Sequence, residues 1–196
     1  MYTHDKVCLA LEVAKKLDIA YVNALVSTSD VMMPIPPSDV GTFGEKFQVQ
    51  ESILDNMEYL LTRITSMVGF AIDRTPIDIL AQLLTSIDST TNSIFDSRGQ
   101  KFIDRCIALT AKHFSRLVIV PANAPDLREN VFSSGKTYNS MIYCESLTNM
   151  IIGTYYRYIE RLQESREKTL IVIPDRLTNQ KERVEFVLAC LRALPI

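Results

Sequence analysis

The sequence is poor in the residues that bind metals. It has only two histidines, His4 and His113, and none of its four cysteines forms a Cys-x-x-Cys pair. Protein zinc sites draw on clusters of such residues at short, recurring spacings. We therefore expect no metal site, and nothing in the sequence calls for a cofactor. A Gly-x-Ser-x-Gly nucleophile elbow is also missing, which removes one common signature of hydrolases.

Long apolar runs are missing as well. No stretch of about 18 apolar residues is free of charge, so we expect no membrane-spanning helix. The first residues lead directly into helical periodicity, without a separate apolar signal segment. The four cysteines are Cys8, Cys106, Cys144 and Cys190. All of them lie inside apolar runs and are expected to be reduced and buried. These features predict a cytoplasmic protein.

The chain has no excess of positive charge. Its net charge is −2 and its pI is near 5.7, so it lacks the broad basic surface on which nucleic-acid binding depends. Hydrophobic residues make up 47% and charged residues 22% of the chain, which is typical of a folded protein. A chain of 196 residues is long enough to bury a substantial core.

Most of the sequence has helical periodicity. We expect helices over 4–17, 46–71, from Pro76 to about 87, and over 99–114, 138–166 and 178–193. The third of these begins with Thr75 as N-cap, Pro76 at N1 and Asp78 at N3. Residues 28–46 contain several prolines and glycines and are expected to be a loop. Residues 19–26 suit either a helix or a strand, and the apolar spacing of Tyr21 and Leu25 favours the helix.

Two short β-branched segments interrupt this pattern. Residues 116–120 and 169–173 are apolar, and each is followed by a proline, so both are expected to be buried strands. The helix between them makes a parallel βαβ unit the simplest arrangement. A third strand could come from residues 19–26, from another protomer, or not exist. The expected fold is mainly α, bundle-like, with a small two- or three-stranded parallel element toward the C-terminus. Residues 1–196 would form one domain, with a helical part at 1–115 and a βαβα part at 116–196.

One segment resembles a phosphate-binding loop. The string Asn130-Val-Phe-Ser-Ser-Gly135-Lys136-Thr137 matches G-x-x-x-x-G-K-[ST], except that Asn130 replaces the first glycine. In such a loop, main-chain N–H groups and the lysine hold phosphates, and the hydroxyl group faces Mg²⁺. The alternative is an ordinary turn that leads into a helix.

Ligands of parallel α/β units bind outside the carboxyl ends of the strands. The two expected strands would place polar loop residues at that edge, where helix N–H groups also favour an anion. The alternative is that these side chains only solvate two turns. The candidate ligand-binding residues are Asn123, Asp126, Arg128, Gly135, Lys136, Thr137, Asp175 and Arg176.

Other features point to protein–protein contacts. The helix expected over 46–71 carries a second apolar stripe of Leu54, Leu61 and Val68, which offers more apolar face than one small domain needs. The proline-rich loop 31–37 is another candidate contact, with a loop strapped over the chain's own core as the alternative. So is the tyrosine group Tyr155, Tyr156 and Tyr158.

These observations favour an interaction or assembly protein that acts as a homo-oligomer through its helices, rather than an enzyme. The alternative function is small-ligand, phosphate or nucleotide handling by loops 121–137 and 174–176.

Overall fold

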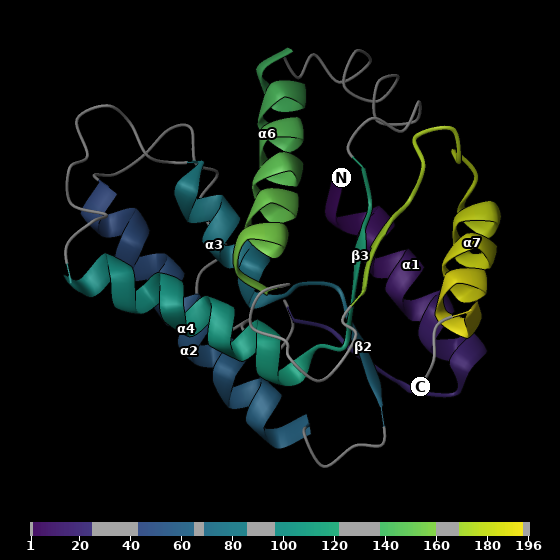
Figure 1. The fold of residues 1–196 in the computed structure, drawn as a ribbon, viewed down its shortest axis with the longest axis horizontal. Coiled ribbons are helices and arrows are strands. Elements are labelled where there is room, and N and C mark those ends of the chain that lie inside the picture. The colour runs from purple at the N-terminus through teal and green to yellow at the C-terminus, as the bar shows by residue number, and fades with distance from the viewer. Residues whose placement is uncertain are drawn as a thin grey trace.

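The computed structural model describes residues 2–24, 43–64, 69–85, 97–121, 138–159 and 169–193. Helices dominate these residues, and four short strands lie among them (Figure 1). In chain order the elements are α1 (Tyr2–Leu17), β1 (Ala20–Val22), α2 (Phe43–Ile64), β2 (Phe70–Ile72), α3 (Pro76–Leu84), α4 (Ser97–His113), β3 (Arg116–Ile119), α6 (Tyr138–Thr154), the π-helical turn η3 (Tyr155–Ile159), β4 (Thr169–Val172) and α7 (Gln180–Ala193).

The end of α1 explains why the chain turns into a strand there. Asp18 has a φ of 53°, in the left-handed region that commonly terminates helices. The N–H of Ile19 then donates to the carbonyl of Ala14 at 3.1 Å and closes the last turn. Strand β1 follows at Ala20, so over Ala20–Val22 the expectation of a helix is wrong and the strand alternative is right, while residues 25 and 26 lie outside the described residues.

The start of α3 agrees with its sequence signal. Thr75 is the extended N-cap residue, Pro76 opens the helix, and Asp78 at the third position bonds back to Thr75. This reciprocal cap satisfies N–H groups that a helix start leaves without partners. Five hydrophobic side chains of this nine-residue helix are buried besides Pro76, which fixes α3 at the centre of the molecule.

The strands form two separate parallel pairs among the described residues. β3 pairs with β4 in the register Arg116↔Thr169 to Ile119↔Val172, which confirms the expected parallel βαβ unit. β1 pairs with β2 in the register Ala20↔Phe70 to Val22↔Ile72. The sequence prediction missed this second pair, because it extended the helix of 46–71 through the residues that form β2, although it left a strand open as an alternative for residues 19–26.

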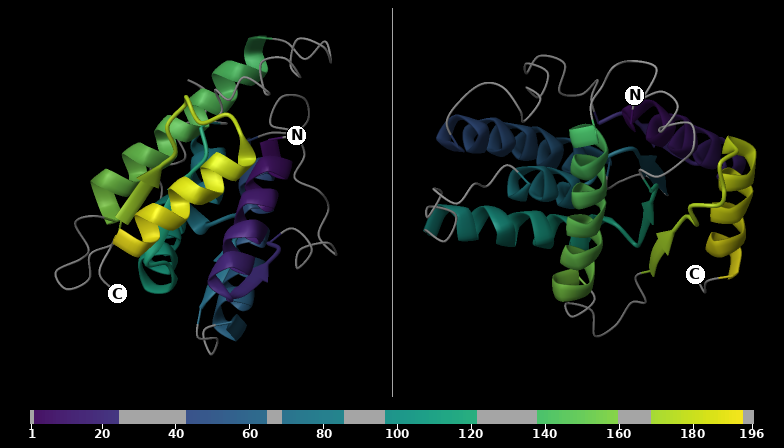
Figure 2. Two further views of the ribbon diagram at one scale, coloured as in Figure 1. Left: turned by 90° about the vertical axis from the view of Figure 1, so that its right-hand side faces the viewer. Right: turned by 90° about the horizontal axis from the view of Figure 1, so that it is seen from above.

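The two pairs lie between layers of helices. Figures 1 and 2 show α1 and α7 together on one side, with α2, α3, α4 and α6 on the other. The core is divided in the same way. One cluster joins buried residues of α2, α3, α4, β3 and α6, and the other joins α1 and α7 with Val120 and Ile173 at the strand ends. The fold is therefore mainly α with small β elements, as expected.

Two helix boundaries differ from the sequence prediction. α6 gives way to η3 at Tyr155, and residues beyond 159 of the expected helix 138–166 lie outside the described residues. α7 begins at Gln180, and the side chain of Asn179 accepts the N–H of Lys181 at 2.8 Å. Asn179 therefore caps this helix, which begins two residues later than the expected start at 178.

Candidate functional site: a cavity between the two strand pairs

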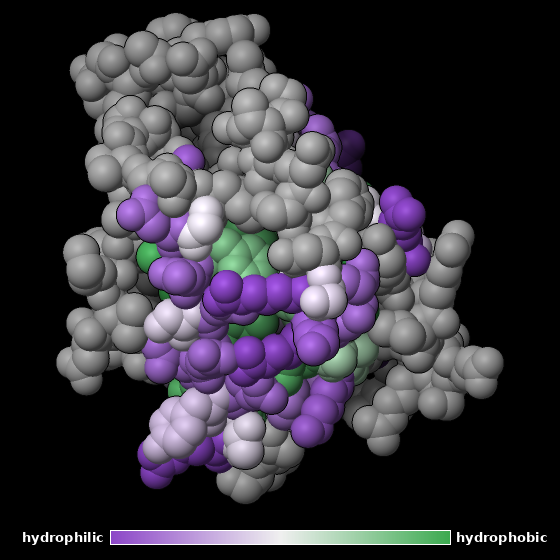
Figure 3. Space-filling view, turned by 90° about the vertical axis from the view of Figure 1, so that its left-hand side faces the viewer, coloured by the Kyte–Doolittle hydropathy of each residue, from purple (hydrophilic) through white to green (hydrophobic). Residues whose placement is uncertain are grey.

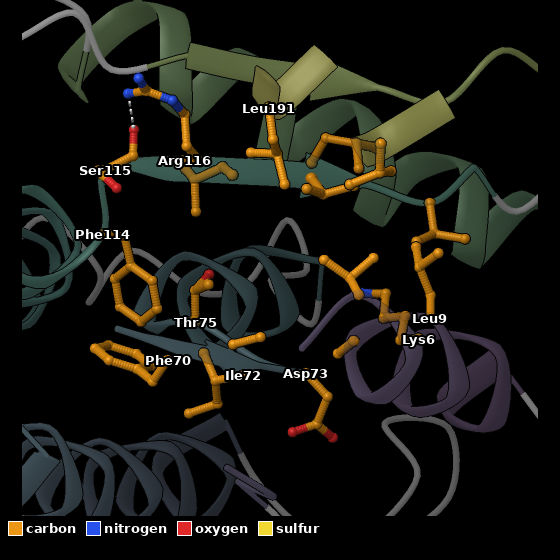
Figure 4. Close-up of a pocket in the computed structure, with 18 of the residues that line it drawn as sticks. Lys6, Leu9, Phe70, Ile72, Asp73, Thr75, Phe114, Ser115, Arg116 and Leu191 are labelled. Carbon is orange, nitrogen blue, oxygen red and sulfur yellow. Dashed lines mark hydrogen bonds between the residues drawn. The ribbon is translucent and has the colours of Figure 1, made fainter. Parts of the chain in front are cut away.

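A cavity of about 560 Å³ separates the two strand pairs. Residues 69–73 around β2 line one side and residues 114–120 around β3 line the opposite side (Figure 4). Leu9 and Val13 of α1 and Leu191 of α7 line the cavity from one helical layer, and Ile151 of α6 lines it from the other. Its walls are therefore mostly apolar and come from both halves of the chain.

An aromatic pair lies at the amino ends of the facing strands. The rings of Phe70 and Phe114 meet edge to face, with centroids 5.8 Å apart and planes at 73°. Such a contact contributes roughly 0.5–1.5 kcal/mol beyond the burial of the two rings. It joins β2 to Phe114, two residues before β3, and so ties together two sheets that share no backbone ladder in the described residues.

An ion pair forms one polar feature of the wall, which Ser115 and Arg116 also line from the β3 side. Lys6 Nζ lies 3.0 Å from Asp78 Oδ1, and the two side chains are only 18% and 19% exposed. The other Asp78 oxygen accepts hydrogen bonds from the N–H and the hydroxyl of Thr75, at 2.8 and 2.7 Å. Burial by itself raises the pKa of Asp78, but the charge of Lys6 and these hydrogen bonds outweigh it, so the pKa lies below its usual value.

The second acidic side chain at this edge points elsewhere. In Figure 4 the Asp73 carboxylate is directed away from the cavity, and its Oδ1 accepts the N–H of Ala24 at 3.0 Å. Its charge, after the larger effect of burial, helps raise the pKa of Tyr21 on β1. Asp73 thus anchors the chain after β1, and the polarity of the cavity wall at this edge rests on Lys6, Asp78 and Thr75.

The size of the cavity suits a small molecule. Its volume of about 560 Å³ falls within the range of small-molecule sites. The space is partly open to solvent, so water fills it when no ligand is bound.

The structure does not gather the candidate residues chosen from the sequence. Six of them, Asn123, Asp126, Arg128, Gly135, Lys136 and Thr137, lie outside the described residues. Asp175 and Arg176 occupy an exposed turn after β4 and do not line the cavity. The cavity instead lies between β2 and β3, so it differs in position from the expected edge beside the loops that follow β3 and β4.

The supposed surplus apolar stripe of α2 is part of the chain's own core. Leu54 and Leu61 are both 0% exposed, and Val68 lies outside the described residues. The outward face is polar: Figure 3 shows hydrophilic side chains over the α2 and α4 side. Arg105 of α4 pairs there with Asp55 at 2.6 Å and with Glu58 of α2. The observation that motivated self-association through α2 is therefore removed.

The other interaction candidates give a mixed result. Tyr155 is buried and packs edge to face on Tyr156, which is half exposed. The side chain of Tyr158 and the whole of loop 31–37 lie outside the described residues. The tyrosine group is thus partly a core element and only partly a surface one.

The cysteines divide into different environments. Cys106 is fully buried, and this burial raises the pKa of its thiol. Cys8 and Cys190 are half-buried, so the expectation of complete burial is wrong for these two, and the side chain of Cys144 lies outside the described residues. In the described part of the chain, no group of three or more histidine, cysteine or acidic side chains is placed to hold a metal ion. Nor does that part contain a helix long and apolar enough to cross a membrane.

Sequence reasoning missed the residues that do line the cavity. Thr75 and Asp78 were recognised, but only as a helix cap. No role was predicted for Lys6, because only the apolar positions of its helix showed a pattern. The sequence does contain a lysine on one helix and an acidic cap on another. No local pattern connects these two residues, so their pairing could not be predicted.

No family model matches the chain, and neither a curated protein nor a solved structure matches it.

Proposed function

We propose that this chain is a binding protein whose ligand, largely apolar, occupies the cavity between β2 and β3. The observation that carries the proposal is a cavity of about 560 Å³ with apolar walls from α1, α6 and α7. Binding sites of this kind combine an apolar lining with a few fixed polar groups. Here those groups are Lys6, Asp78 and Thr75, whose mutual bonds hold them in place.

The proposal takes up the alternative function inferred from the sequence and moves it to a different place. Phosphate handling by loops 121–137 and 174–176 gains no support from the exposed Asp175 and Arg176. Self-association stays a prediction, to be checked by light scattering at micromolar concentrations.

A fluorescent apolar probe, 8-anilinonaphthalene-1-sulfonate, tests the proposal. We expect saturable binding of one probe per folded chain, with a rise in melting temperature as the probe concentration increases. Leu191 lines the cavity and is only half-buried, so Leu191→Trp should fill part of the space and weaken binding at least tenfold. Ala10→Phe, in the α1 part of the same lining, should act in the same way.

Arg192→Trp is the matched control, because this neighbouring position on α7 is exposed and outside the lining. The chain has no tryptophan of its own, so each variant also carries a single reporter. Emission from position 191 should be blue-shifted relative to position 192. Equal probe binding by the two tryptophan variants and the unmodified chain would contradict the proposal.

A further inference from the structure

The ion pair in the cavity wall is electrically balanced. Lys6 Nζ and Asp78 Oδ1 are 3.0 Å apart, and both residues line the cavity. Figure 4 shows Lys6 reaching from α1 toward the space between the strand pairs. A charged ligand beside this pair would be attracted by one partner and repelled by the other, while it lost its own hydration. Because a buried charge needs a partner of its own, this wall disfavours ions of either sign.

The other charged side chains of the described lining do not alter this balance. Asp73 accepts the N–H of Ala24, and its carboxylate is directed away from the cavity. Arg116 donates to a main-chain carbonyl at 3.0 Å, and Figure 4 shows its guanidinium extending away from β2. Lys112 is exposed, so water solvates its ammonium group. Of the described charged groups, the ion pair is therefore the one that a ligand inside the cavity meets.

The carboxylate of Asp78 has room for one more hydrogen bond. A carboxylate accepts at about four lone-pair positions. Asp78 uses three of them, for the ammonium group of Lys6 and for the N–H and the hydroxyl of Thr75. The pKa of Asp78 lies below its usual value, so the group is ionised at neutral pH and acts only as an acceptor. The remaining position suits a ligand group that carries a hydrogen-bond donor but no charge.

We propose that the ligand of this cavity is an uncharged apolar alcohol, whose hydroxyl donates to Asp78 while its apolar body occupies the rest of the space. This inference rests on the proposed function and gives its ligand a chemical class. The pair of Lys6 and Asp78 determines the specificity, because it disfavours carboxylates and amines and favours a neutral donor. An ether of the same shape lacks the donor, and a site built to bind a hydroxyl discriminates against such an analogue.

The test compares four naphthalene compounds that share one ring system: 2-naphthalenemethanol, its methyl ether, 2-naphthoate and 2-naphthalenemethylamine. At neutral pH they present a hydroxyl, an ether oxygen, an anion and a cation. Affinity for the full chain is measured by titration calorimetry, and displacement of the fluorescent probe places each compound in the cavity. The sulfonate of that probe can stay in water, because the cavity is partly open to solvent.

We expect the unmodified chain to bind the alcohol at least tenfold more tightly than each of the other three compounds. A purely apolar cavity would prefer the ether, which has more apolar surface, so this order depends on the donor. Lys6→Met leaves the Asp78 carboxylate without its cation and should shift the preference toward the amine by at least tenfold. Asp78→Asn removes the negative charge and should shift the preference toward the naphthoate.

Lys15→Met is the matched control, since Lys15 is an exposed residue of the same helix outside the lining. It should leave the order of the four affinities unchanged. Lys6→Met keeps the bonds between Thr75 and Asp78 that cap α3, so it supplies the deciding result if Asp78→Asn does not fold. Equal binding of the alcohol and the ether, or an unchanged preference in Lys6→Met, would overturn the assignment of an alcohol. If the fluorescent probe still binds, the proposed function stands without it. If neither the probe nor any naphthalene compound binds, both fall.

Discussion

The contacts of Asp78 give the sharpest prediction about stability. Asp78→Ala removes the carboxylate that caps α3 through Thr75 and pairs with Lys6. A lost cap costs about 1 kcal/mol. A lost hydrogen bond to a charged partner costs about 1.5–3 kcal/mol, and here it leaves a mostly buried ammonium group behind. The total is about 2–4 kcal/mol, a large share of the stability of a typical domain.

Urea unfolding measures this loss. The midpoint should fall while the slope stays constant, because the surface exposed on unfolding does not change. The melting temperature should fall by roughly 4–16 °C for a chain of this size. Glu182→Ala is the matched control: Glu182 also lies in the first turn of a helix, but it is exposed. We expect the control to cost less than about 0.5 kcal/mol.

The pH dependence provides a second check on the same residue. The folded-state pKa of Asp78 lies below its usual value of 3.8. A lowered pKa contributes stability that is fully present above the unfolded-state pKa and is lost as the pH falls through the folded-state pKa. The stability difference between the unmodified chain and Asp78→Asn should therefore shrink as the pH is lowered from 7 toward 2. A cost below 0.5 kcal/mol for Asp78→Ala, or a difference that is constant with pH, would refute the reasoning.

Three further variants or measurements test other parts of the structure. Arg105→Ala should lower the free energy of unfolding by only about 0.5–1 kcal/mol, and by less at high salt, because the bonds of Arg105 to Glu58 lie on the surface. A loss in urea unfolding that does not depend on salt would contradict this. The thiol of Cys106, buried and with a raised pKa, should be the slowest of the described cysteines to react with a thiol reagent in the native state, and rapid native labelling read by mass spectrometry would count against it. The hydroxyl of Tyr21 is buried and has no hydrogen-bond partner in the described part of the chain, so Tyr21→Phe should leave the melting temperature unchanged or raise it, and a clear decrease would show a missing partner.

Local patterns in the sequence were enough to predict the mainly α fold and the parallel β3–β4 pair. Thr75 and Asp78 marked the start of α3 because a helix cap depends on residues only three positions apart. β1 was predicted only as an alternative to a helix, and β2 was missed, because three residues are too few to establish a period of two. What makes them strands is their pairing with each other across a long stretch of chain and the left-handed turn at Asp18.

The cavity could not be predicted for a different reason. It exists because β2 and β3 line a common space without pairing, and no single residue encodes the distance between two elements. Lys6 and Asp78 are 72 residues apart and meet only in the folded chain, so neither side chain has a local signal for its partner. The spacing of Leu54 and Leu61 does mark a second apolar stripe on α2. Neighbouring helices of the same chain bury this stripe, and that burial depends on tertiary packing, which the spacing does not reveal.

The packing of α1 against α7 has a consequence for how the chain folds as it is synthesised. These helices lie at opposite ends of the sequence, yet they share one core cluster that includes Leu9, Val13 and Val187. During translation α1 can pack on β1 and β2 once they are made, but the side of α1 that contacts α7 stays uncovered until α7 has left the ribosome. Contacts of such long sequence separation slow folding and prolong the exposure of apolar surface. The early chain should therefore depend on a chaperone, and its first protease-resistant fragment should be the α2–α4 region rather than the N-terminal helix.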